Sequence, residues 1–107
     1  MRNLRLPIAA LLVAAGPALA GAFEDGVAAY QQQDYATALR FWRPLAQGGD
    51  SSAQSNLGVM YDKGQGVAKD DQQAVAWYRK AADQGDADAQ YNLGVMYAKG
   101  QGVAKDD

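Results

Sequence analysis

The sequence of 107 residues contains no cysteine and no histidine, so the chemistry that these residues provide is absent. Without cysteine, disulfides, thiolate nucleophiles and Cys-ligated metals are excluded. Without histidine there is no imidazole base, no Ser-His-Asp triad and none of the usual histidine-containing zinc sites. The net charge of −2 argues against a nucleic-acid-binding protein, which normally carries a basic patch. We therefore expect no metal, no other cofactor and few of the common catalytic groups.

The first twenty residues have the pattern of a secretory signal peptide. Arg2 and Arg5 precede a short apolar run over residues 6–15, and a small-x-small site follows at residues 18–20. The run is shorter than the ~20 residues needed to cross a bilayer, so we expect no stable membrane anchor after cleavage. We predict cleavage after Ala20, with Ala22 as the alternative, and a periplasmic or secreted location.

Residues typical of β-strands are scarce in the rest of the chain. From residue 21 onward it contains sixteen alanines, six valines, one threonine and no isoleucine. Alanine favours helices, whereas β-branched and aromatic residues favour strands. The composition therefore predicts an all-α protein. Pro44 falls within one predicted helix, which we expect it to end or kink.

An internal repeat is the most informative feature of the chain. Residues 53–71 recur 36 residues later as residues 89–107, with seventeen of nineteen positions identical. The exceptions are Ser55 against Tyr91 and Asp62 against Ala98. A repeat period of 20–50 residues is typical of solenoids, in which each unit stacks on the next.

Each unit is predicted to be a pair of helices. We expect first helices over residues 51–63 and 87–99, a second helix over 72–84, and a more divergent pair over 23–33 and 35–47. Asp50 and Asp86 are suitable N-caps, and Gly64 and Gly100 are suitable left-handed residues after the last turn. Apolar residues at helical spacing predict one buried stripe on each helix. Gly58, together with its repeat equivalent in the helix over 87–99, suggests close helix packing.

The repeat resembles a known family. The motif Ala-x-x-x-Gly-Asp-x-x-Ala-Gln-x-x-Leu-Gly-x-Met-Tyr-x-x-Gly-x-Gly-Val-x-x-Asp, followed by Ala-x-x-Trp-Tyr-x-x-Ala-Ala, is similar to the Sel-1-like repeat, which is related to the tetratricopeptide repeat. Its copies begin at Ala46 and Ala82. The resemblance implies a right-handed α/α superhelical solenoid, here of about two and a half units, of a bacterial exported type. It also implies that a protein or peptide partner binds on the concave face.

The signal-peptide pattern and the resemblance together divide the chain into four segments. These are a signal peptide at 1–20, a tetratricopeptide-like first helix pair at 21–49, a Sel-1-like repeat at 50–85 and an incomplete second repeat at 86–107. Some relatives regulate envelope sensors or belong to cell-surface polysaccharide machinery.

The same resemblance places the first helices along the concave face. The partner-binding residues predicted there are Ser55, Asn56, Val59, Lys63, Tyr91, Asn92, Val95 and Lys99. Alternatively, these eight residues form an ordinary solvent-exposed surface that binds no partner. The aromatic pairs Phe41-Trp42 and Trp77-Tyr78 are expected in the core rather than in a ligand platform.

Other sites and functions are less favoured by the residues. The segment Gly64-x-Gly66 with Lys69 lacks the Gly-Lys-Ser/Thr ending of a phosphate-binding loop, and helix capping explains Asp70-Asp71 better than metal binding does. We expect a non-enzymatic interaction scaffold, with a truncated or nonfunctional array fragment as the alternative. A cell-wall or β-lactam hydrolase is disfavoured because no Ser-x-x-Lys motif is present. The partner, the oligomeric state and the completeness of the chain are left open.

Overall fold

The computed structural model describes residues 21–103, in which there are five α-helices and no β-strand. The helices are α2 (Ala22–Gln31), α3 (Tyr35–Gln47), α4 (Ser51–Lys63), α5 (Asp71–Asp83) and α6 (Ala87–Lys99). None of these described helices has the length and apolar character needed to cross a bilayer. The predicted signal peptide and residues 104–107 lie outside the described residues.

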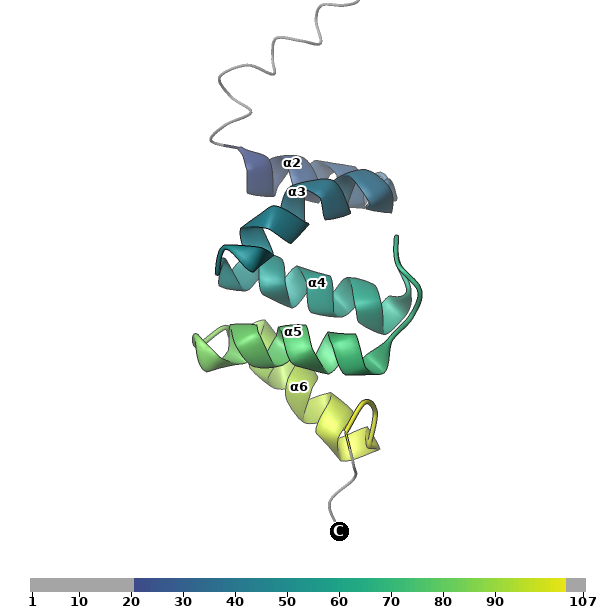
Figure 1. The fold of residues 1–107 in the computed structure, drawn as a ribbon, viewed down its shortest axis with the longest axis vertical. Coiled ribbons are helices and arrows are strands. Elements are labelled where there is room, and N and C mark those ends of the chain that lie inside the picture. Colours follow the sequence, from purple (N-terminus) through teal and green to yellow (C-terminus); the bar gives the residue numbers. More distant parts are fainter. Residues whose placement is uncertain (1–20, 104–107) are drawn as a thin grey trace, which may run out of the picture.

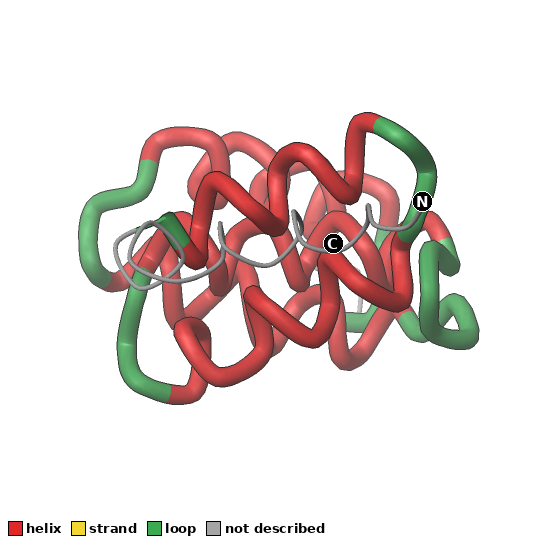
Figure 2. Tube along the Cα trace, turned by 90° about the horizontal axis from the view of Figure 1, so that it is seen from above, coloured by secondary structure: helices red, strands yellow, loops and turns green. Residues whose placement is uncertain are grey.

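The helices stack one after another along a single long axis (Figure 1). Each helix packs against the next one in the chain, and α4 also contacts α6. Seen along the long axis, the helices overlap and the connecting loops gather at two opposite sides (Figure 2). The first helices of the units, α2, α4 and α6, therefore all begin at one side of the molecule and end at the other (Figure 1). This arrangement confirms the predicted all-α solenoid.

The helix boundaries follow from local residues, as the sequence predicts. The carboxylates of Asp50 and Asp86 each accept a hydrogen bond of 2.9 Å from the backbone N–H three residues further on. Gly64 and Gly100 each follow the last helical residue with a φ of 69°, in the left-handed region that favours glycine. Both capping predictions are thus confirmed.

Pro44 does not end its helix, so of the two predicted effects, an end or a kink, the first is wrong. It lies in the last turn of α3, and the helix continues to Gln47. The Pro44 carbonyl still accepts a hydrogen bond of 3.0 Å from the Gly48 N–H, so the final turn closes although proline lacks its own N–H. The helix α2 ends at Gln31, before the predicted residue 33, because Gln33 has a left-handed φ of 64°.

The core forms two clusters, each built around an aromatic ring that covers a glycine. Trp42 of α3 covers Gly26 of α2, and Tyr78 of α5 covers Gly58 of α4; a Cβ on either glycine would clash with the ring. These two rings are 2 % and 1 % exposed, which confirms their predicted place in the core. Gly94 of α6 differs, because no described atom lies within 4 Å of where its Cβ would stand. The close packing expected at Gly94 is therefore absent within the described residues.

Candidate functional site

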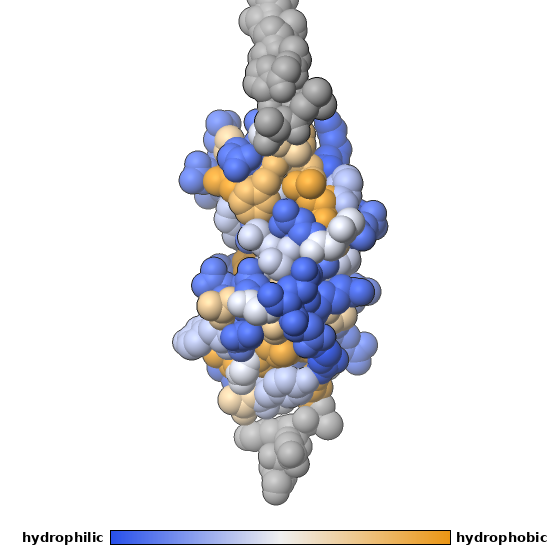
Figure 3. Space-filling model, turned by 90° about the vertical axis from the view of Figure 1, so that its left-hand side faces the viewer, coloured by the Kyte–Doolittle hydropathy of each residue, from blue (hydrophilic) through white to orange (hydrophobic). Residues whose placement is uncertain are grey.

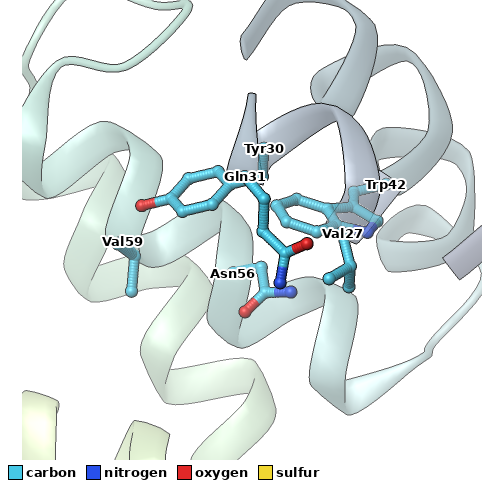
Figure 4. A pocket seen from close by; sticks show the side chains of 6 residues that line it. All are labelled: Val27, Tyr30, Gln31, Trp42, Asn56 and Val59. Atoms are coloured by element: carbon cyan, nitrogen blue, oxygen red, sulfur yellow. The ribbon is translucent and has the colours of Figure 1, made fainter. Parts of the chain in front are cut away.

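An apolar pocket opens between α2 and α4, on the surface formed by α2, α4 and α6, which we call the first-helix face. The pocket has a volume of about 440 Å³ and is lined by Val27, Tyr30, Gln31, Trp42, Asn56 and Val59. Val27 and Val59 lie on opposite sides, with the rings of Tyr30 and Trp42 between them (Figure 4). The pocket can therefore bury an apolar side chain while two amide groups remain available for hydrogen bonds.

The aromatic wall of this pocket is held in place by the fold. The Trp42 indole N–H donates a hydrogen bond of 3.1 Å to the Phe23 carbonyl, and the Trp42 and Tyr30 ring centroids are 5.6 Å apart. The Tyr30 hydroxyl donates a hydrogen bond of 2.8 Å to the Gln65 side chain in the loop after α4. A partner would thus meet a wall whose rotamers are already fixed, which lowers the entropy cost of binding.

A second, polar pocket adjoins the first one where α2, α4 and α6 begin. We call it the acidic pocket; its volume is about 160 Å³ and its lining is Phe23, Ser52, Ser55, Asn56, Asp86 and Asp88. Asn56 lines the two pockets, so the two share a wall. Figure 3 views the molecule from this side: hydrophobic residues gather at the level of α2 and α3 and give way to hydrophilic residues below them.

The carboxylates of the acidic pocket have no cationic partner among residues 21–103. No lysine or arginine nitrogen in this part of the chain lies within 4.0 Å of Asp86 or Asp88. The ion pairs found in the same part of the chain join Lys69 to Asp71 at 2.7 Å and to Asp62 at 3.8 Å. The hydrogen bond with Asp71 is the main reason that the pKa of Lys69 is raised.

The structure brings some of the predicted partner-binding residues to these pockets. Asn56 and Val59 line the apolar pocket, and Ser55 lines the acidic pocket, although only 5 % of Ser55 is exposed. Lys63 is exposed in the last turn of α4 and lines neither pocket. The same holds for the predicted residues of α6, none of which lines either pocket: Tyr91, Asn92, Val95 and Lys99. A binding role for the eight residues stays a prediction.

Sequence reasoning missed the contribution of α2 to the pocket. The signal was present, because Gly26 and Gly58 hold the same place in their units but stand 32 residues apart. The first unit has a shorter loop and falls out of the 36-residue register. In the register set by the glycines, Phe23, Val27 and Gln31 correspond to Ser55, Val59 and Lys63. The predicted face therefore extends onto α2 once the loop is taken into account.

The comparisons with known proteins agree with the repeat and the fold. A family model described as the Sel1 repeat matches residues 18–50, 51–86 and 87–107. The chain belongs to the Sel1 repeat family. Its first segment, which resembles a tetratricopeptide pair in sequence, is matched by this same model. Sel1-repeat proteins are generally non-catalytic scaffolds for protein–protein interaction. A comparison with curated proteins finds no match.

Solved structures show the same Sel1 architecture. A Sel1 repeat protein from Oxalobacter formigenes is 39% identical, with a TM-score of 0.73, over 79% of this chain and 34% of that one. A protective antigen with an SLR fold, present in uropathogenic Escherichia coli strains, is 40% identical, with a TM-score of 0.78, over 84% of this chain and 21% of that one. The present chain thus spans about a third and about a fifth of these two proteins.

The two pockets offer groups that are suited to binding. The two pockets present apolar surface, amide groups and carboxylates, and residues 21–103 contain no group of three acidic, histidine or cysteine residues that could hold a metal ion. Burial, followed by the nearby charge of Asp62, raises the pKa of the Tyr78 hydroxyl. Tyr78 therefore stays protonated at neutral pH and serves as a packing group over Gly58.

Proposed function

We propose that this Sel1-repeat chain is an exported, non-catalytic scaffold whose first-helix face binds a peptide segment of a partner protein. The observation that carries the proposal is the apolar pocket between α2 and α4, which contains two of the predicted binding residues, Asn56 and Val59. Proteins of this family are generally interaction scaffolds. An envelope sensor or a component of polysaccharide machinery is the class of partner that the family resemblance suggests.

The pocket has the composition expected of a peptide-binding site. Its valines and aromatic rings provide apolar area, and buried apolar area stabilises a complex by roughly 25 cal/mol per Å² before the costs of association. The amides of Gln31 and Asn56 supply the few oriented polar groups that fix a ligand's orientation. Such a pocket suits one apolar side chain of an extended or helical peptide.

Site-specific photocrosslinking in the bacterial host tests this proposal. A photoreactive residue is placed at Lys63 or Lys99, which are exposed at the ends of α4 and α6, and at Ala76, which is exposed on α5. We expect the two first-helix positions to give the same partner adduct and the α5 position to give none. Val59→Gln should weaken the adduct by making the pocket polar.

A matched substitution separates the pocket from the rest of the face. Val95 holds the position of Val59 in the next unit and is similarly half-buried, but it does not line the pocket. Val95→Gln should leave the adduct unchanged. Equal adducts from all three labelled positions, or no adduct at all, would refute the proposed binding face; the second result favours the alternative of a nonfunctional fragment.

Export is tested separately from binding. The first thirty residues are fused to an alkaline phosphatase that is active only outside the cytoplasm. We expect an active fusion, and we expect replacement of the apolar run at residues 6–15 by serine and glycine to abolish activity. Phosphatase activity that survives this replacement would contradict the predicted signal peptide.

A further inference from the structure

We propose that the partner segment carries an apolar side chain and, a few residues away, a lysine or arginine, and that the two adjoining pockets select this pair. The inference rests on the proposed function and deepens it by naming the chemistry of the partner. The apolar side chain enters the pocket between Val27 and Val59, and the cationic group enters the acidic pocket beside Asp86 and Asp88.

The charge distribution along the first helices favours a cation at the acidic pocket. Glu24 and Asp25 lie in the first turn of α2, and Asp50, Asp86 and Asp88 lie at the starts of α4 and α6. Three helix N-termini offset this with a partial charge of roughly +0.5 each. Five carboxylates against about 1.5 positive charges leave the starts of these three helices negative.

The basic residues of the first helices are too distant to neutralise these carboxylates. Lys63 and Lys99 lie in the last turns of α4 and α6, each of which has 13 residues. A helix of that length is about 20 Å long at 1.5 Å per residue. This is about two Debye lengths at physiological ionic strength. The acidic pocket therefore presents its charge to an incoming group.

A buried hydroxyl in the acidic pocket also lacks a partner. Ser55 is only 5 % exposed and lines the pocket, yet its hydroxyl makes no hydrogen bond to any other residue within 21–103. Its neighbour Gln54, equally buried, donates to the Ala46 carbonyl and accepts from Gln84. An ammonium or guanidinium group in the pocket would donate to the Ser55 oxygen and satisfy it.

The two pockets are close enough for one short segment. Ser52 lines the acidic pocket and Val59 the apolar pocket, so the linings span seven residues of α4, or about 10 Å. An extended peptide covers that distance in about three residues. Asn56 lies on the wall that the two pockets share. Its side-chain amide has an N–H₂ donor and a C=O acceptor, which can bond to the backbone of such a segment.

The repeat itself shows why this position differs from the next. The residue equivalent to Ser55 in α6 is Tyr91, which is 73 % exposed. A small side chain at Ser55 leaves the acidic pocket open at the side of α4. We therefore expect selection of the cation at this one place rather than in every unit.

Peptide binding by fluorescence anisotropy tests the inference on the whole chain. The probes are fluorescein-labelled octapeptides of glycine and serine that carry one phenylalanine and, two or three positions away, one lysine. Two companion probes replace the lysine by glutamate or the phenylalanine by serine. We expect the lysine probe to bind roughly tenfold more tightly than the glutamate probe, and this difference should shrink at 1 M NaCl.

A charge-reversal variant tests whether the lysine of the probe binds in the acidic pocket. Asp88 is exposed, so Asp88→Lys should preserve the fold, and we expect it to reverse the preference between the lysine and glutamate probes. Asp83→Lys makes the same change in charge at an exposed position of α5 outside the pocket and should leave the preference in place. A reversal by both variants would mean that net charge alone governs binding and would overturn the inference.

The outcomes separate the inference from the proposed function. If the phenylalanine probes bind, Val59→Gln weakens them, and lysine and glutamate are equivalent, the inference fails and the binding face stands. If none of the probes binds, the cation inference is refuted for this face, and the photocrosslinking experiment decides on the face itself. Because the comparison of probes needs no variant, the result holds even if a substituted chain does not fold.

Discussion

Alanine at Gly58 and at Gly94 is expected to change stability in opposite directions, although the two glycines lie in nearly identical sequences. Both occupy the middle of a first helix, and the residues from two before to three after each glycine are the same. In an exposed helix, replacing glycine by alanine stabilises by about 0.8–1.0 kcal/mol, because alanine loses less backbone entropy. Gly94→Ala should show this gain, since nothing lies within 4 Å of the new Cβ.

At Gly58 the same gain is opposed by a clash. The new Cβ would overlap the ring of Tyr78, which is 1 % exposed and has little room to move. Overpacking a core typically costs 1–3 kcal/mol. Because the helix-propensity gain is common to the two variants, the difference between them isolates the overpacking cost, and we expect it to be about 1–3 kcal/mol.

Urea unfolding followed by circular dichroism at 222 nm measures this difference. In a domain of this size, 1 kcal/mol corresponds to roughly 4–8 °C in Tm, so thermal scans should also resolve it. The double variant Gly58→Ala, Tyr78→Leu should lose less stability than the sum of its parts, because leucine relieves the overlap. The reasoning is refuted if Gly58→Ala and Gly94→Ala shift stability by the same amount and in the same direction.

Two further predictions concern helix capping and pH. Asp50→Ala should lower the free energy of unfolding by about 1 kcal/mol, because the Asp50 carboxylate caps α4, whereas Asp83→Ala at an exposed position should change it little; denaturant titration compares them. Stability should fall above about pH 10, because an unfolded tyrosine ionises near that pH while burial raises the pKa of Tyr78 in the folded chain. Below that pH the hydroxyl is protonated in folded and unfolded chains alike and the effect is absent. Tyr78→Phe should flatten the alkaline decline, and an unchanged slope would contradict this origin.

Much of the fold could be predicted from residues that act locally. An aspartate before and a glycine after α4 and α6 set the ends of these two helices, because caps and left-handed residues work within one turn of chain. The end of α2 was less predictable, since it depends on Gln33, a residue that seldom adopts a left-handed φ. Pro44 did not end α3, because residues after it still close the final turn by bonding to its carbonyl.

The candidate site was only partly predictable. Asn56 and Val59 could be found because they repeat on one side of a helix, and the pocket contains them. The remaining wall comes from α2 and α3, whose register against α4 is hidden by the shorter first loop. Asp86 is an N-cap in the sequence, and only the stacking of α6 beside α4 places it in a pocket.

By itself, then, the sequence determined the helices, their caps, the repeat and hence the solenoid, because these depend on neighbours along the chain. Only the tertiary structure decided which faces are covered, because coverage depends on what packs against each helix. Ser55 is buried in the wall of the acidic pocket while Tyr91, its equivalent, is exposed. Gly58 lies beneath a ring while Gly94 meets no described atom. Nearly identical motifs are therefore covered differently, according to the helix that lies beside them.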